Sequence, residues 1–76
     1  MEKVIKDILS KSFEKAVVDI QGGEAKYTVS ITSDEFANKS IIERHKMIYV
    51  LLDSYIKSGE IHALTIKSYT FDEIQK

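Results

Sequence analysis

Histidine is the residue type in this sequence best suited to metal or proton chemistry, because the 76 residues include two histidines and no cysteine. His62 stands near the start of Ile61–Tyr69, where alternating apolar and polar residues predict a strand. The alternation puts His62 on the side of Leu64, which helices are expected to cover, at a partly exposed rim. Such a histidine either bonds a backbone carbonyl or offers a neutral imidazole to a metal ion or a partner. Spacing alone favours the first, because reactive histidines are a minority.

The second histidine, His45, falls in a helical pattern between Ile41 and Ile48. A structural role is favoured there, because a buried polar group usually satisfies a local hydrogen bond. His45 and His62 do not stand at a recognised spacing of metal ligands. A two-histidine site within this chain therefore has little support.

Basic residues are a third candidate set, around the start of the same helix. They are Lys39, Arg44, Lys46 and Lys67. They either form a basic patch that contacts nucleic-acid phosphates or belong to a solvated face that also carries Glu43 and Asp53. The net charge of −1 argues against a generic polyanion binder, because phosphate contacts supply most of that affinity.

Enzyme chemistry finds no support in the sequence. Gly22-Gly23 lacks the other glycines and the lysine of a phosphate-binding loop. Asp34-Glu35 resembles a helix approach more than a catalytic pair, and no nucleophile and base stand at a meaningful spacing. The lack of cysteine excludes a disulfide framework and any cysteine-rich metal site built from this chain alone.

The long helix that leads to His62 has clear limits in the sequence. Ser40 and Glu43 form a capping box at its start, and Ser58-Gly59 ends it. A broad apolar stripe is predicted from Ile41, Ile48, Leu52 and Tyr55, flanked by Ile42, Tyr49 and Ile56. A second capping box, Thr70 to Glu73, predicts a short final helix.

The first half of the chain predicts a helix and a hairpin. An amphipathic helix is expected from Glu2 to about Lys15, then a strand over Ala16–Ile20, a turn over Gln21–Glu24, and a strand over Lys26–Thr32. In the connection Ser33–Lys39, Phe36 is expected beneath the long helix and Asn38 in a left-handed conformation.

These elements predict one α+β domain over residues 1–76, in the order α-β-β-α-β-α. A hairpin followed by a right-handed helical crossover gives a three-stranded mixed sheet, and helices on one face complete a two-layer sandwich. No apolar run reaches the roughly 20 residues of a membrane span. No signal peptide is recognisable, so we expect the cytoplasm, or an organelle matrix if a targeting segment was removed.

Residues 27–74 resemble the BolA family, in particular its short bacterial and organellar members. The matching segments are VSITSDEF (29–36), KS (39–40), RHKMIY (44–49) and IHALTIKSYT (61–70). The resemblance implies a fold like a type II KH domain and a non-enzymatic adaptor role. It implies a monomer that forms a heterodimer with a monothiol glutaredoxin and takes part in [2Fe–2S] cluster sharing, transfer or iron signalling.

The resemblance implies that His62 is the ligand this chain offers to the shared cluster, while glutaredoxin cysteine and glutathione hold the other iron. An imidazole in place of a thiolate raises the reduction potential. The family's second ligand is a histidine or cysteine of the first hairpin loop, but Gln21–Lys26 contains neither. Lys26 stands at that position, and a protonated lysine cannot bind iron. Either His62 is joined by solvent, Glu24 or a backbone ligand, or the cluster does not form stably.

The alternative function is a KH-like nucleic-acid-binding transcriptional regulator that uses the four basic residues. The Gly-x-x-Gly loop of KH domains is missing, which ranks this alternative lower. Phe36-Ala37-Asn38 also departs from the family's Phe-x-Gly, and asparagine is the best replacement for a left-handed glycine.

Overall fold

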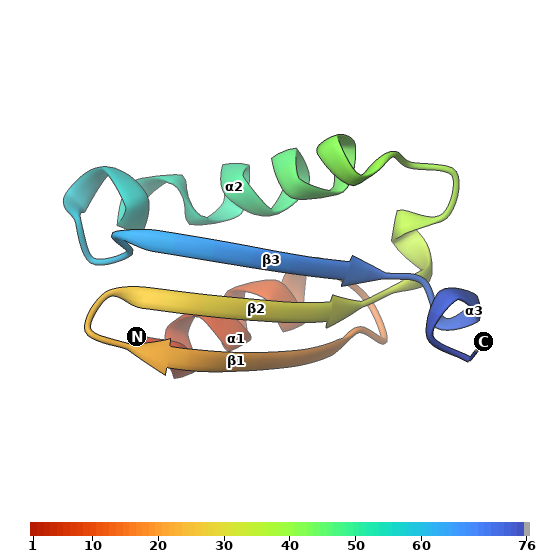
Figure 1. Ribbon diagram of the computed structural model, residues 1–76, viewed down its shortest axis with the longest axis horizontal. Helices are drawn as coiled ribbons and strands as arrows, with labels where there is room; N and C mark the ends of the chain where they lie inside the picture. The colour runs from red at the N-terminus through yellow and green to blue at the C-terminus, as the bar shows by residue number, and fades with distance from the viewer. Residues whose placement is uncertain (76) are drawn as a thin grey trace.

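The computed structural model describes residues 1–75, which form seven elements (Figure 1). They are α1 (Glu2–Ser12), β1 (Val17–Gly23), β2 (Lys26–Thr32), the 3₁₀ helix η1 (Asp34–Phe36), α2 (Ile41–Ser58), β3 (Ala63–Tyr69) and α3 (Phe71–Ile74). The predicted α-β-β-α-β-α order is confirmed, with η1 as a short addition. No helix within residues 1–75 combines the length and the apolar character needed to cross a membrane.

The sheet has the order β1-β2-β3, so β2 is central. It pairs antiparallel with β1 and parallel with β3, which confirms the mixed sheet. In Figure 1, α2 runs along β3 and α1 lies behind the strands. The core between sheet and helices contains Ile5 and Leu9 of α1, Val29 and Ile31 of β2, Ile48 and Leu52 of α2, and Ile66 of β3. The two-layer sandwich is therefore confirmed.

The first hairpin is tighter than the sequence indicated. β1 continues to Gly23, which pairs with Lys26, and the turn contains only Glu24 and Ala25. Both turn residues have positive φ, 53° and 67°, as a type I′ turn requires. Gly22 allows the close pairing, because a Cβ there would overlap the Lys26 carbonyl oxygen. The predicted four-residue turn was wrong because strand pairing continues through both glycines.

The first helix is shorter than predicted. It ends at Ser12, and Phe13 is extended, with φ −118° and ψ 110°. The Phe13 ring packs on Phe36, with 5.2 Å between the ring centres. The predicted end near Lys15 was wrong, because apolar spacing alone does not show that Phe13 leaves the helix to fill the core.

The start and end of α2 agree with the sequence. The Ser40 hydroxyl accepts a hydrogen bond from the Glu43 amide at 3.1 Å, and the Ser40 amide donates to the Glu43 carboxylate at 3.0 Å. Gly59 ends the helix with φ 85°. Asn38 has φ 64° and Phe36 is fully buried, as expected for the connection.

The buried face of α2 is rotated from the predicted stripe. Ile48 and Leu52 are fully buried, but Ile41 and Ile42 are 63% and 68% exposed. Arg44 lies on the buried side instead, 7% exposed. The stripe was predicted from apolar residues alone, and a distant carboxylate makes the burial of this arginine possible.

We expect Ile48→Ala to lower the free energy of unfolding by about 2–5 kcal/mol, because it leaves a cavity in the core. Val50→Ala is the matched control on the same helix, since Val50 is 75% exposed, and it should change stability by less than about 0.5 kcal/mol. Urea unfolding measures both. Equal losses would contradict the observed orientation of α2.

The α2 capping box predicts a pH dependence. The bond from the Ser40 amide, then the Ser40 hydroxyl contact and nearby Lys39 and Lys46, hold the pKa of Glu43 below its usual value. A lowered carboxyl pKa contributes stability above the usual pKa, and this is lost as pH falls through the lowered value. Glu43→Gln keeps a capping side chain without charge, so its stability should approach that of the wild type at acid pH. Carboxyl NMR titration checks this, and a Glu43 pKa at or above the usual value would refute it.

Candidate functional site

The backbone around His62 is fixed by the first hairpin. His62 lies immediately before β3, and its amide donates a hydrogen bond to the Ala25 carbonyl at 2.6 Å. The Ala63 amide donates to the same carbonyl at 3.1 Å, and the Ile61 amide donates to the Tyr55 carbonyl at 3.0 Å. Two connections, the hairpin turn and the end of α2, therefore hold the segment that carries the imidazole.

The side chain of His62 is exposed at the rim of the helix-covered side. It lines a shallow depression of about 120 Å³ together with Tyr49, Ile56, Ile61 and Leu64. Ile61 is buried and Leu64 half-buried, so the floor of the depression is apolar. The arrangement offers one accessible imidazole beside apolar side chains, where another molecule can contact it.

Of the two hairpin residues considered as a second ligand, Lys26 points away from His62 and Glu24 is exposed. Lys26 pairs with Ala63, and strand alternation sends its side chain to the sheet face opposite the helices, away from the His62 depression. Glu24 is exposed in the turn. Residues 1–75 contain no group of three or more His, Asp or Glu side chains that could hold a metal ion. Of Glu24, Lys26 and His62, only His62 lines the depression.

His45 lies on a different element from His62. It is half-buried near the start of α2, while His62 follows the end of that helix. His45 does not line the depression that contains His62, although Tyr49, one turn further along α2, does.

The predicted basic residues do not form one surface. Arg44 is buried, and its guanidinium donates to both carboxylate oxygens of Glu73 at 2.8 and 3.0 Å. This pair raises the pKa of Arg44 above its usual value. The expectation that Arg44 lies on a solvent-facing patch was wrong, because its guanidinium is neutralised within the fold.

The three lysines of that set are separated. Lys46 is exposed on α2 and Lys39 is half-buried before it. Lys67 is exposed on β3 between buried Ile66 and Ser68, so it leaves the sheet on the face away from the helices. Nothing gathers these cations into one groove.

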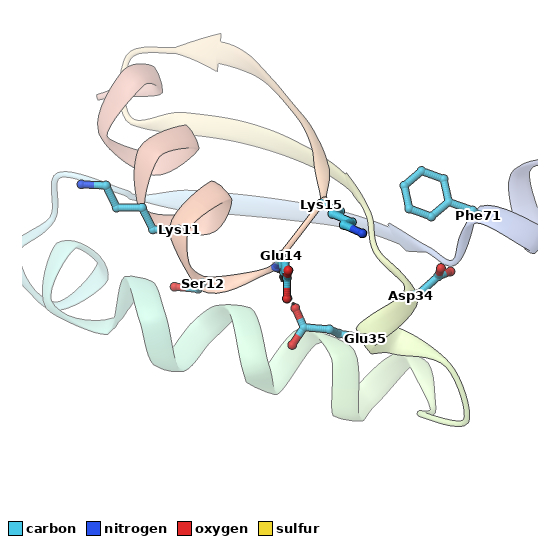
Figure 2. A pocket seen from close by; sticks show the side chains of 7 residues that line it. All are labelled: Lys11, Ser12, Glu14, Lys15, Asp34, Glu35 and Phe71. Carbon is cyan, nitrogen blue, oxygen red and sulfur yellow. Dashed lines mark hydrogen bonds between the residues drawn. The ribbon is translucent and has the colours of Figure 1, made fainter.

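A second cavity, of about 490 Å³, opens where β2 and β3 end, at the other end of the sheet from His62 (Figure 2). Its lining is Lys11, Ser12, Glu14, Lys15, Asp34, Glu35 and Phe71. The carboxylates of Glu14 and Glu35 point toward each other, and the Glu14 amide donates to Glu35 Oε2 at 3.0 Å. Asp34 and Glu35 begin η1, as the expected helix approach. Both acidic residues and lysines line this cavity, and its lining contains no histidine.

Sequence reasoning missed two features of these surfaces. Tyr49 and Ile56 line the His62 depression, and their seven-residue spacing was a usable signal for a shared helix flank. The partner of Arg44 could not be found this way, since Glu73 stands 29 residues later.

Comparison with known proteins agrees with the resemblance. The model of the family described as "BolA-like protein" matches residues 2–73. An uncharacterized protein of Haemophilus influenzae is 42% identical over 69 residues, covering 91% of this chain and 81% of the relative. The Escherichia coli relative named "DNA-binding transcriptional regulator BolA" is 31% identical over 72 residues, covering 95% of this chain and 66% of that protein.

Solved structures show the same fold. The BolA domain of SufE1 from Arabidopsis thaliana superposes with a TM-score of 0.86 at 32% identity, over 95% of this chain and 93% of that one. BolA1 from Arabidopsis thaliana gives a TM-score of 0.85 at 28% identity, over 95% and 93%. With both the family model and the fold in agreement, this chain belongs to the BolA-like family.

Proposed function

We propose that this chain is a non-enzymatic adaptor that binds a monothiol glutaredoxin and offers His62 to a [2Fe–2S] cluster shared between the two proteins. The observation that carries the proposal is the exposed imidazole of His62 beside an apolar depression. A ligand for another protein's iron must be accessible in the free chain, and His62 is.

Two physical features support this role for His62. The backbone bonds to Ala25 and Tyr55 fix the position of the segment before any partner arrives, which lowers the entropic cost of binding. The apolar floor formed with Ile61 and Leu64 favours removal of water at a protein contact. A neutral imidazole can then donate its lone pair to iron.

In this proposal the chain supplies His62, and the other positions belong to glutaredoxin cysteine, glutathione and a further group. That further group is solvent, a backbone atom or the carboxylate of Glu24, because Lys26 leaves the opposite face of the sheet. A [2Fe–2S] cluster supplies electron-transfer capacity when bound. A site with one weakly held position suits transfer of the cluster better than long-term storage.

We expect the His62 side chain to control cluster sharing. Purified chain, a monothiol glutaredoxin, iron, sulfide and glutathione are mixed anaerobically, and the visible circular dichroism is recorded. Wild type should change the spectrum of the glutaredoxin-bound cluster, whereas His62→Ala should leave that spectrum unchanged because the imidazole ligand is missing. His45→Ala is the matched control and should behave as wild type, because His45 does not line the depression that contains His62.

An unchanged spectrum with wild type, or equal spectra for wild type and His62→Ala, would refute the proposal. If His45→Ala abolishes the spectral change that wild type produces, the assignment of the ligand to His62 would be contradicted. If glutaredoxin binds with the same affinity with and without iron, and with and without the His62 side chain, then the chain binds glutaredoxin but does not share a cluster.

Nucleic-acid binding is the second candidate, because the Escherichia coli relative is named as a DNA-binding transcriptional regulator. It uses the exposed Lys46 and Lys67 with the half-buried Lys39, since Arg44 is neutralised by Glu73. The separation of these lysines over two faces ranks it second.

If the chain binds duplex DNA, the logarithm of the binding constant should fall with the logarithm of salt concentration by about 0.9 per phosphate neutralised. Lys46→Gln should reduce that slope by about 0.9, because one phosphate contact is removed. Fluorescence anisotropy at several salt concentrations measures this. A flat salt response, or no binding, excludes this candidate.

A further inference from the structure

Arg44 is a charged side chain that the function proposed for His62 does not use, and it lies near the other end of β3. Its side chain is 8% exposed. Nε donates to the Lys39 carbonyl at 3.0 Å, and Nη1 donates to the Ser68 carbonyl at 3.3 Å. The guanidinium also lies over Phe36, with 5.8 Å between Cζ and the ring centre. These contacts fix the guanidinium independently of any carboxylate.

The carboxylate of Glu73 occupies the remaining side of this guanidinium. Its two oxygens accept from Nη1 and Nη2 at 2.8 and 3.0 Å, which is the bidentate geometry that arginine forms with carboxylates and phosphates. The side chain of Glu73 is 44% exposed, although that of Arg44 is not. The Glu73 carboxylate therefore lies between the buried Arg44 guanidinium and solvent, where solutes can reach it.

The helix that carries Glu73 is weakly attached. α3 has four residues and buries none of them, whereas α1 fully buries Ile5 and Leu9. Ile74 of α3 is 50% exposed. Segments with few buried apolar contacts open at low free-energy cost. The ion pair with Arg44 is therefore one of the contacts that dock α3.

The residue whose carbonyl accepts from this guanidinium, Ser68, also carries a hydroxyl without a hydrogen-bond partner among residues 1–75. Ser68 is 9% exposed, and its Oγ has no hydrogen-bond partner among residues 1–75. Strand alternation puts the Ser68 side chain on the helix-covered side with Ile66, where Arg44 lies. A buried hydroxyl without a partner costs free energy, so an added acceptor there is favourable. The two oxygens of Glu73 do not satisfy it.

We propose that Arg44 and Ser68 form an oxyanion-binding site that Glu73 fills from within the chain, so that an external phosphate or carboxylate group displaces α3. The Arg44 guanidinium is positioned and desolvated before any ligand binds. Glu73, which occupies the site from within the chain, is at the surface, and α3, which carries it, buries none of its four residues. A phosphate has more acceptor oxygens than a carboxylate and can also reach the Ser68 hydroxyl. The site is remote from His62, so its test does not depend on the cluster.

Glu73→Gln is the deciding variant. Glutamine can replace glutamate in a capping box, so the Thr70 box at the start of α3 is kept while the negative charge that faces Arg44 is removed. We expect this variant to bind inorganic phosphate at least about tenfold more tightly than wild type, because no internal anion competes for a charge-assisted pair. Binding is followed by the NMR signal of the Arg44 Nε–H group during titration with phosphate and, separately, with acetate.

Glu43→Gln is the matched control, since Glu43 holds the same position in the α2 capping box but has no hydrogen bond to Arg44. It should bind phosphate as weakly as wild type. Adding Arg44→Gln to Glu73→Gln should abolish binding. Ser68→Ala in the Glu73→Gln background should weaken phosphate binding and leave acetate binding unchanged, which separates the two kinds of ligand.

A second readout uses the wild-type protein and needs no variant to fold. Phosphate should speed hydrogen exchange of the Glu73 amide, which donates to Thr70 Oγ1, and leave the Glu43 amide unaffected. The proposal is overturned if Glu73→Gln binds phosphate no better than Glu43→Gln. It is also overturned if binding survives loss of Arg44, or if phosphate leaves α3 exchange unchanged.

Discussion

The parallel pairing of β3 with β2 is the interaction on which both surfaces of this chain depend. At the start of β3, the Ala25 carbonyl accepts hydrogen bonds from the His62 and Ala63 amides and fixes the imidazole at the rim. At the end of β3, the Ser68 carbonyl accepts from Arg44, and the chain continues into α3. One strand register therefore positions an exposed imidazole at one end and a buried cation at the other.

The two surfaces treat polar groups in opposite ways. His62 is left accessible next to apolar side chains, so another molecule can reach its imidazole. Arg44 is taken out of water, which is costly unless its donors are satisfied. Two carbonyls, a carboxylate and an aromatic ring together meet that requirement. The cost of an unpaired guanidinium explains why a four-residue helix stays docked.

Local signals in the sequence predicted what local forces decide. Both capping boxes were found correctly, because each needs only a hydroxyl and a carboxylate three residues apart. The mixed sheet followed from the order of elements and the handedness of crossovers. Errors arose where packing overrides local preference: Phe13 leaves its helix to meet Phe36, and the hairpin pairs through both glycines.

The sequence by itself determined the α+β order, the long capped helix, and His62 before the last strand, because periodicity and capping are properties of neighbouring residues. Only the tertiary structure decided that Arg44 turns inward to Glu73, that Lys26 leaves the face away from His62, and that Tyr49 joins the His62 depression. These depend on which distant elements meet and on the register between strands. The pattern of residue types along the sequence shows neither which distant elements meet nor how the strands are aligned.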